Sequence, residues 1–312
     1  MSREVARSFE CFGGRCAVRV LDRDSEAAVA AVREARASLL DAHRTLSRFD
    51  PDSELSRLNR DPRPVVPVSP LLLRVVAAAL TAGLRSGGLV DATLVGEIEA
   101  AGYAGSRAFD RPGTDREAPR TRPGGPSPIA GWCSLAVDER AGTVSRPPGV
   151  RIDPGGIAKG LLADLIGESL ADFEGFAVDC CGDLRVGGTA RRPRTILVDD
   201  PAGGEPLGEL RIADGAVATS GITRRAWTGE DGRPAHQILD PATGRPAFTG
   251  VVQVTALAPT GLLAETCAKA ALLAGPERAA AYLPFGGVVV EDGGAVQEVD
   301  PIGAVLPEVA TR

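Results

Sequence analysis

Two segments in the first third of the chain have apolar residues at helical spacing. Residues 25–46 carry alanines, valines and leucines one helical turn apart, and Ser25 is a residue type that caps helices. A second helix is predicted over residues 70–85, because Ser69 can cap it and proline is tolerated at the first helical position. The segment between them, residues 49–59, is rich in turn formers and too polar for a core element.

The rest of the chain is dominated by short runs with β-strand character. These runs cover residues 134–137, 143–145, 176–179, 183–186, 195–198, 209–212, 216–219, 251–257 and 287–290. Two further helices are predicted, at residues 157–170 and 262–273. Because strands mostly follow strands instead of alternating with helices, the pattern predicts an α+β fold with mostly antiparallel sheets and packed helices.

Residues 104–128 differ from their surroundings. They are dense in proline, glycine and arginine and show no periodicity, which predicts a flexible surface insertion. The chain has neither an internal repeat nor a clear linker. We therefore expect one domain that spans residues 1–312 and carries this insertion.

Composition narrows the classes of protein that the chain can belong to. With a net charge of −6 and no cluster of basic residues, the sequence does not favour nucleic-acid binding. It contains no apolar run long enough for a membrane span and no apolar signal segment near the N-terminus, so we expect a cytoplasmic protein without membrane insertion. The six cysteines form no CxxC pair, and they are expected to be buried thiols.

The strongest local feature is a glycine turn that leads into a helix, RIDPGGIAKGLLADLI at residues 151–166. Gly155 and Gly156 allow a tight turn, and the helix N-terminus that follows presents free N–H groups to an anion such as phosphate. Lys159 lies in the first turn of this helix. The segment matches neither a P-loop nor a dinucleotide-binding fingerprint. A glycine turn that only packs a helix is the alternative.

Two other segments contain groups that could act chemically. His236 lies in AHQILDPATGRP and precedes a tight turn, so it is a candidate general base, or a hydrogen-bonded surface histidine. The segment ATSG, residues 218–221, offers hydroxyls and close backbone approach to a ligand, or forms a turn. The other histidine, His43, lies inside the first predicted helix and is expected to be structural.

The chain contains only two lysines among its 35 basic residues, Lys159 and Lys269. Both fall in segments with the character of a site, and ammonium and guanidinium groups are not interchangeable near oxygen ligands. Lys269 lies four residues after Glu265 in the last predicted helix, where the two side chains share one face. A functional role is therefore favoured for both lysines, although an ordinary surface ion pair would also explain the second.

Taken in order, five segments resemble the ApbE-type FAD:protein FMN transferases over nearly the whole chain. They are SRFDPDSELSRLN, GGLVDATLVGEIEAAGY, RIDPGGIAKGLLAD, ATSG and HQILDPATGRP. The resemblance implies that FAD is held between the halves of a single α+β unit. It assigns binding of FAD to Ser53, Asn59, Asp91, Thr93, Asp153, Gly155, Gly156, Lys159, Asp183, Thr219, Ser220, Gly221 and Asp240.

The reaction that the resemblance implies is attack by a threonine hydroxyl of an acceptor protein on the FMN phosphorus, with release of AMP. His236 matches the residue that takes the proton of the hydroxyl, and Lys159 is placed beside the phosphates as a second catalytic residue. The resemblance also implies a Mg²⁺ ion, held by a carbonyl that matches Ala158 and by an aspartate and a threonine of the late helix.

Here the sequence departs from the family pattern. The positions of the metal-binding aspartate and threonine are Glu265 and Lys269, and Cys181 replaces a glycine. A protonated ammonium cannot coordinate Mg²⁺, but it could take the place of the ion beside Glu265 and the diphosphate. Two alternatives to transfer stay open: an FAD diphosphatase that yields FMN and AMP, and a non-catalytic FAD-binding protein.

Overall fold

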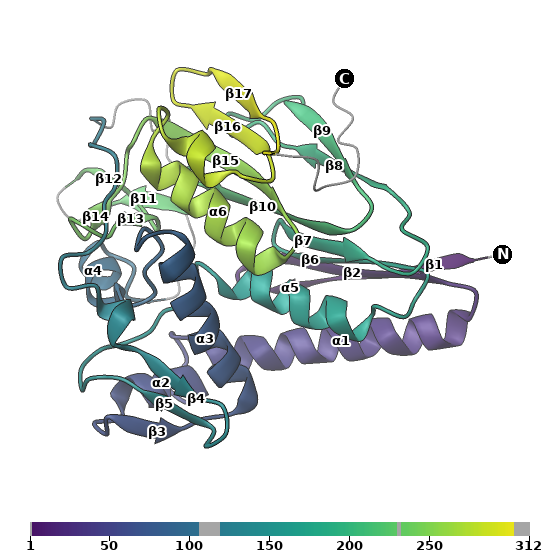
Figure 1. Cartoon of the computed structure of the whole chain (residues 1–312), viewed down its shortest axis with the longest axis horizontal. Helices are drawn as coiled ribbons and strands as arrows, with labels where there is room; N and C mark the ends of the chain where they lie inside the picture. Colours follow the sequence, from purple (N-terminus) through teal and green to yellow (C-terminus); the bar gives the residue numbers. More distant parts are fainter. Residues whose placement is uncertain (1, 106–118, 230–231, 303–312) are drawn as a thin grey trace.

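A computed structural model describes residues 2–105, 119–229 and 232–302. Its largest element is a sheet of eight strands, whose order in the sheet differs from their order along the chain (Figure 1). The order of the strands is β1-β2-β6-β7-β10-β15-β16-β17, and every neighbouring pair is antiparallel. Their bounds are β1 Arg3–Cys11, β2 Gly14–Asp22, β6 Gly175–Cys180, β7 Asp183–Gly187, β10 Gly215–Gly221, β15 Val251–Ala258, β16 Gly287–Glu291 and β17 Val296–Val299. The predicted α+β class with antiparallel pairing is confirmed.

Helices cover one face of this sheet. The α-helices of the described residues are α1 Ser25–Leu46, α2 Glu54–Arg60, α3 Pro70–Arg85, α4 Val95–Ala100, α5 Ala158–Ser169 and α6 Gly261–Ala274. Figure 1 shows α1, α5 and α6 lying along the sheet, with α1 against β1 and β2, α5 against β6 and β7, and α6 against β10 and β15. Side chains alternate across a strand, so Phe176 and Val178 of β6 pack toward these helices.

The opposite face of the sheet is covered by a hairpin of β8 (Arg194–Val198) and β9 (Gly208–Ile212). Ala177, between the two inward-facing residues of β6, packs in this second apolar cluster with Val198 and Leu210. The molecule therefore has three layers: helices, the large sheet and the hairpin.

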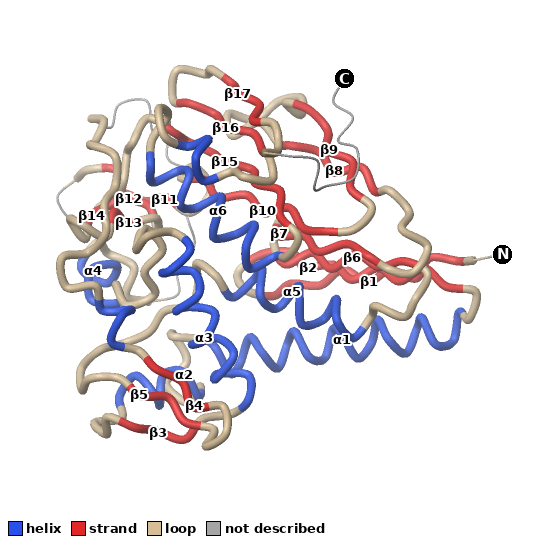
Figure 2. The backbone as a smooth tube through the Cα atoms, in the orientation of Figure 1, coloured by secondary structure: helices blue, strands red, loops and turns tan. Residues whose placement is uncertain are grey.

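Smaller elements surround the end of the sheet where α3 lies (Figure 2). A three-stranded sheet has the order β3-β5-β4, and two short hairpins pair β11 with β12 and β13 with β14. Their bounds are β3 Val65–Pro67, β4 Ala136–Asp138, β5 Thr143–Ser145, β11 Ala226–Thr228, β12 Pro234–His236, β13 Leu239–Asp240 and β14 Arg245–Pro246. Two 3₁₀ turns, η2 Gly131–Ser134 and η3 Ala279–Tyr282, complete the described elements.

The first two predicted helices occur with the predicted bounds, but two details of that region differ. The carboxylate of Asp24, and not Ser25, caps α1 by accepting hydrogen bonds from the N–H groups of Glu26 and Ala27. The polar segment 49–59 was predicted to lie outside the core, and this is wrong, since α2 begins at Glu54 and buries Leu55 and Leu58. Polar residues there serve as caps and as the outer face of a short amphipathic helix.

Strands β1 and β2 are absent from the predicted set. β1 is one of the two edge strands of the sheet, and most of its side chains are charged or exposed, so it lacks the apolar alternation that indicates a strand. Among the described residues, no helix combines the length and the apolarity that a membrane crossing requires.

Part of the predicted insertion at 104–128 lies outside the described residues, namely 106–118. At its far end the backbone is held by the rest of the chain: Gly124 N donates to the carbonyl of Leu273 at 2.7 Å, and Gly125 N donates to the Asp240 carboxylate at 2.9 Å. The flexibility of the insertion, and the single-domain organisation, stay predictions.

Helices α5 and α6 cross at two glycines. A Cβ on Gly160 would lie 2.2 Å from the carbonyl oxygen of Gly261, and a Cβ on Gly261 would lie 2.5 Å from that of Gly160. Below the crossing, the carboxylate of Asp164 accepts the N–H groups of Gly261 and Leu262 at the start of α6. This contact cannot form with larger residues, and it brings the first turn of α5 against the start of α6.

We expect Gly160→Ala to lower the free energy of unfolding by about 1–3 kcal/mol, because the methyl group forces two helix backbones apart. Urea unfolding of purified protein measures this. The matched control is Gly96→Ala on α4, an exposed helical glycine with only a long contact to Arg151, where alanine should stabilise the helix by up to about 1 kcal/mol. An unchanged midpoint for Gly160→Ala would contradict the close crossing.

Candidate functional site

A cavity of about 610 Å³ opens beside the first turn of α5. Its wall contains the turn between β1 and β2, the end of α1, the loop that precedes α5, and one face of α6. Lining residues from these segments include Phe12, Gly13, His43, Arg48, Asp91, Tyr103, Asp153, Gly155, Gly156, Ala158, Lys159, Arg225, Gln237 and Lys269. This volume lies in the range of sites for small molecules and cofactors.

Lys159 connects three elements at the base of this cavity. Its ammonium donates to the carboxylate of Asp183 at the start of β7 and to Oε1 of Glu265 on α6, the latter at 3.1 Å. The second oxygen of Glu265 accepts the N–H of Gly160 at 2.9 Å. Burial by itself would lower the pKa of Lys159, but the two carboxylates outweigh it and raise that pKa. Lys159 is therefore a fixed cation at physiological pH.

Lys269 lies one helical turn beyond Glu265 and reaches the glycine turn. Its ammonium donates to the carbonyl of Gly156 at 2.8 Å. Burial lowers the pKa of Lys269, while Glu265 opposes that shift. Both lysines of the chain thus lie at the start of α5, Lys159 on the helix itself and Lys269 against the preceding glycine turn, and both line the cavity.

The residues at the expected metal position do not fit a Mg²⁺ ion. Both oxygens of Glu265 already accept hydrogen bonds, and Lys269 presents an ammonium where the ion requires an oxygen ligand. Of the expected ligands, the carbonyl of Ala158 and the carboxylate of Glu265 are suitable donor types, but the carboxylate is already paired with Lys159 and with the N–H of Gly160. The described part of the chain also contains no cluster of three or more histidine, cysteine or acidic side chains placed to hold a metal.

The glycine turn before α5 is held by Asp153. One oxygen of its carboxylate accepts the N–H of Gly155 at 2.9 Å, and the other pairs with Nε of Arg48 at 2.8 Å. Opposite, Asp91 accepts the N–H and the hydroxyl of Thr93 with a single oxygen, at 2.8 and 2.6 Å. The other oxygen, Oδ2, is buried without a partner, and burial raises the pKa of Asp91. That oxygen is free to accept a hydrogen bond from a ligand.

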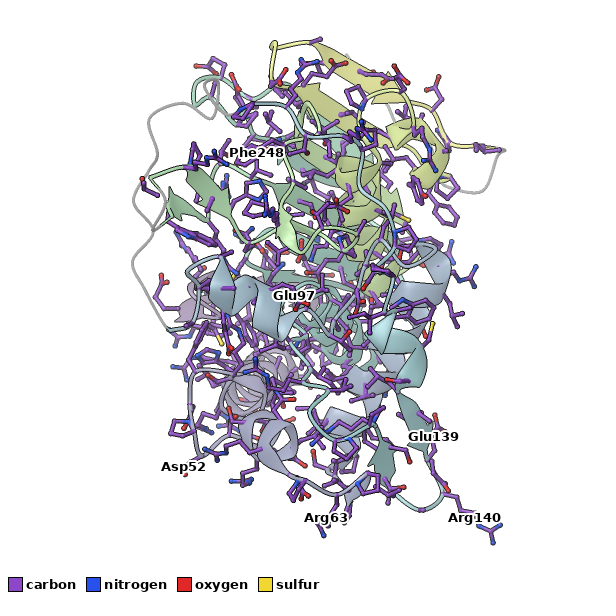
Figure 3. All side chains as sticks on the ribbon, turned by 90° about the vertical axis from the view of Figure 1, so that its left-hand side faces the viewer. Asp52, Arg63, Glu97, Glu139, Arg140 and Phe248 are labelled. Carbon is purple, nitrogen blue, oxygen red and sulfur yellow. The ribbon has the colours of Figure 1, made fainter. Side chains whose placement is uncertain are left out.

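Two of the residues predicted to contact FAD, Ser53 and Asn59, form hydrogen bonds with the backbone around the site. The hydroxyl of Ser53 caps α2 and donates to the carbonyl of Ser47. The amide of Asn59 brackets the backbone of Ile152, donating to its carbonyl at 2.8 Å and accepting from its N–H at 2.7 Å. In Figure 3 the neighbouring Asp52 lies at the lower edge of the molecule, away from the part that contains Phe248. Contact of Ser53 and Asn59 with FAD stays a prediction.

The remaining predicted residues lie on the sheet and its hairpins. Thr219 of β10 shares a hydrogen bond of 2.9 Å with the hydroxyl of Thr255, and Ser220 is buried beside it, with Gly221 at the end of the strand. The carboxylate of Asp240 organises its own turn by accepting from Ala242 N and the Thr243 hydroxyl, and it also accepts from Gly125 N. These are structural contacts, and roles toward FAD stay predictions.

His236 ends β12 and is fully buried. Its Nδ1 accepts the N–H of Ile238 at 3.2 Å, its ring meets that of Phe248 edge-on at 4.7 Å, and its Nε2 has no hydrogen-bond partner. Burial lowers the pKa of His236 to about 3, with the backbone of Ala247 opposing the shift. The ring is therefore neutral at physiological pH, and the following residue, Gln237, lines the cavity.

Several residues of the cavity wall were not predicted from the sequence. Arg225 approaches the β1–β2 turn and donates to the carbonyl of Phe12 at 2.9 Å, and Tyr103 stacks at a tilt against Trp227. His43, expected to be structural, also lines the cavity, with its ring edge-on to Phe12. Arg225 and Tyr103 lie outside the periodic segments, so no periodicity singles them out.

With the geometry in place, comparison with known proteins gives a consistent set of relatives. The model of the ApbE family matches residues 12–288. The FAD:protein FMN transferase of Treponema pallidum is 32% identical over 308 residues, covering 90% of this chain and 82% of that protein. The one of Vibrio cholerae is 30% identical over 242 residues, covering 75% and 70%. The ApbE protein crystal structure from Thermotoga maritima superposes with a TM-score of 0.76 at 26% identity, covering 95% and 97%.

We expect the buried neutral His236 to make stability pH-dependent. Its pKa is lowered in the folded state, so the unfolded chain binds the extra proton, and stability is lost as the pH falls from about 6.5 toward 3. The loss should approach about 1.4 kcal/mol per pH unit in this window. Chemical unfolding at pH values from 7 to 4.5 measures the slope for the unaltered protein and for His236→Asn, which should lose this contribution.

The control for that experiment is Phe248→Leu, which disturbs the same ring contact without removing a titrating group. It should lower stability at every pH and keep the slope of the unaltered protein. Equal slopes for the unaltered protein and His236→Asn would contradict a neutral buried histidine.

Proposed function

The chain belongs to the ApbE family, and from this premise we propose that it transfers the FMN half of FAD to an acceptor protein and releases AMP. Relatives that carry the name FAD:protein FMN transferase, at 30–32% identity, support the proposal. The observation that carries it is the placement of Lys159 and Lys269 at the start of α5, on the wall of a cavity of cofactor size.

In the proposed complex, the diphosphate of FAD faces the positive end of this cavity. Lys159, Lys269 and Arg225 supply positive charge, so the site opposes the negative charge of two linked phosphates. The rings of FAD meet apolar and aromatic wall, including Phe12 and Tyr103. The free oxygen of Asp91 accepts a hydrogen bond from an N–H or O–H group of FAD.

The proposed reaction is a phosphoryl-type transfer to a threonine hydroxyl of the acceptor. The hydroxyl oxygen attacks the FMN phosphorus, the bond to the bridging oxygen breaks, and AMP leaves with the electron pair. Fixed cations stabilise the charge that develops on the leaving phosphate. The proton of the hydroxyl must pass to a base. We assign this to His236, whose ring is neutral, although Nδ1 must first release the N–H of Ile238.

The test mixes purified protein with FAD, alone and with an extract of cells that lack this gene, and measures AMP and flavin fluorescence that survives a denaturing gel. Transfer predicts AMP together with a fluorescent protein band that appears only with the extract. AMP and FMN at the same rate without the extract would instead identify an FAD diphosphatase. Binding of FAD without AMP in either sample would identify a non-catalytic FAD-binding protein.

We further propose that Lys269 takes the place that Mg²⁺ holds in other members of the family. The ammonium lies on the cavity wall beside the carbonyl of Gly156, and Glu265 is already satisfied by Lys159 and Gly160. An ammonium at this position offsets the diphosphate charge without an added ion. The activity of the unaltered protein is therefore expected to be independent of divalent metal.

We expect Lys269→Thr to lower AMP release by about 10²–10³-fold in the absence of metal. A unit charge about 4 Å from a phosphate oxygen contributes roughly 4 kcal/mol at an effective dielectric constant of 20. Added Mg²⁺ should restore part of the rate, because threonine supplies an oxygen ligand beside Glu265. Rates are measured with EDTA and with a Mg²⁺ titration.

The matched control is Lys269→Met, which keeps an unbranched side chain only one atom shorter and has neither charge nor oxygen. It should lose activity to the same extent and gain nothing from Mg²⁺. Loss of the activity of the unaltered protein in EDTA would refute the replacement of the ion by Lys269.

A further inference from the structure

Four cysteines gather where the turn between β1 and β2 meets the turn between β6 and β7. Cys16 of β2 lies directly opposite Cys180 of β6 in the antiparallel register, and Cys181 follows in the turn. The carbonyl oxygen of Cys11 accepts hydrogen bonds from two of the thiols, that of Cys181 at 3.3 Å and that of Cys16 at 3.8 Å. All four are free thiols.

Within this group, Cys16 and Cys181 are placed to form a bond. Their sulfur atoms are 3.7 Å apart, and a disulfide requires about 2.05 Å, so a small rotation of the side chains would bring them together. Space for Cys181 is provided by Gly14, since a Cβ there would lie 3.1 Å from the Cys181 sulfur. The backbone of Cys181 has a φ of +59°, which a non-glycine residue rarely adopts.

The two thiols differ in access and in acidity. Cys16 is completely buried, whereas Cys181 is only half-buried. The hydrogen bond with Cys16 lowers the pKa of Cys181, and the positive charges of Lys159 and Arg225 lower it further against the effect of burial. Contacts with the neighbouring thiols raise the pKa of Cys16. An accessible thiol with thiolate character beside a buried partner is the arrangement of an oxidation-sensitive pair.

We propose that Cys181 and Cys16 form a peroxide-sensitive dithiol, with Cys181 as the reacting thiol and Cys16 as its resolving partner. The thiolate of Cys181 attacks one oxygen of hydrogen peroxide, giving a sulfenic acid and hydroxide. The thiol of Cys16 then attacks that sulfur, and water leaves as the disulfide forms. The two sulfurs lose two electrons in total and the peroxide gains them. A dithiol reductant reverses the step by exchange.

Closure of this pair would tie the β1–β2 turn to the β6–β7 turn at the edge of the cavity. Phe12 and Gly13 of the first turn line the cavity, and Asp183, which holds Lys159, follows the second turn. The proposal does not depend on the proposed flavin transfer, because it concerns the thiols alone.

The test treats the full-length protein with hydrogen peroxide, alkylates the remaining thiols and maps tryptic peptides without reduction. We expect an intact mass lower by two hydrogen atoms and a cross-link between the peptides of residues 16–19 and 160–185. Dithiothreitol should remove both. Because the longer peptide contains Cys180 and Cys181, variants identify the partner.

Cys181→Gly should abolish the cross-link, and it should fold readily because glycine adopts the positive φ of this turn without strain. Cys180→Ala and Cys133→Ser, the latter at an exposed cysteine away from the turn, should retain the cross-link at the level of the unaltered protein. A cross-link that persists in Cys181→Gly would overturn the assignment. Oxidation of Cys181 to a sulfinic acid without any cross-link would overturn it as well.

Discussion

The rest of the site depends on one buried cation, Lys159, held between two carboxylates. Removing either Asp183 or Glu265 would leave charge uncompensated in a nearly dry place, which in proteins costs about 3–5 kcal/mol. The three residues come from α5, β7 and α6, so their contact fixes the helix layer against the sheet. Glu265 reaches this position because α5 and α6 cross at Gly160 and Gly261 with backbones in contact.

The charge balance around Lys159 has a consequence for the chemistry. Lys159 and Lys269 offset Asp183 and Glu265, and Arg225 adds positive charge at the cavity wall. Asp153 is paired with Arg48, so an anion entering the cavity meets a site without net negative charge even when no ion is added. A dication at the same place would have to displace an ammonium and separate Glu265 from Lys159. Lys269 at the expected metal position is thus accompanied by a Glu265 that is already paired with Lys159 and Gly160, and it is not an isolated change.

Sequence patterns predicted those parts of the fold that bury one continuous apolar face. Helices α1 and α3 and the central strands have such faces, and their bounds follow the predicted ranges closely. Helix α2 was missed because its polar residues form the helix cap and hydrogen bonds to neighbouring backbone, and they hide its apolar face. Strand β1 was missed because an edge strand can carry charged residues at most positions. Propensity and periodicity indicate which residues are buried, so they do not predict elements that specific hydrogen bonds stabilise.

For the site, residue patterns singled out the glycine turn and both lysines, and the family resemblance added Asp91. The sequence could not indicate Arg225 or Tyr103, which reach the cavity only through the tertiary fold. Nor could it predict the burial of His236, because a histidine at the end of a short polar strand is equally compatible with an exposed position. Exposure depends on what packs over a strand, here Phe248 and the turn after β14.

The contacts of Ser53 and Asn59 show how a residue of a sequence motif can support a site without lining its cavity. Asn59 fixes the backbone of Ile152 from both sides, and Asp153, the next residue, then orients the N–H of Gly155 and pairs with Arg48. A glycine turn has few intrinsic preferences, so its shape must be imposed by neighbours. Residues two steps removed from a ligand are therefore constrained as tightly as those that would touch it, and a motif records both kinds of constraint without distinguishing them.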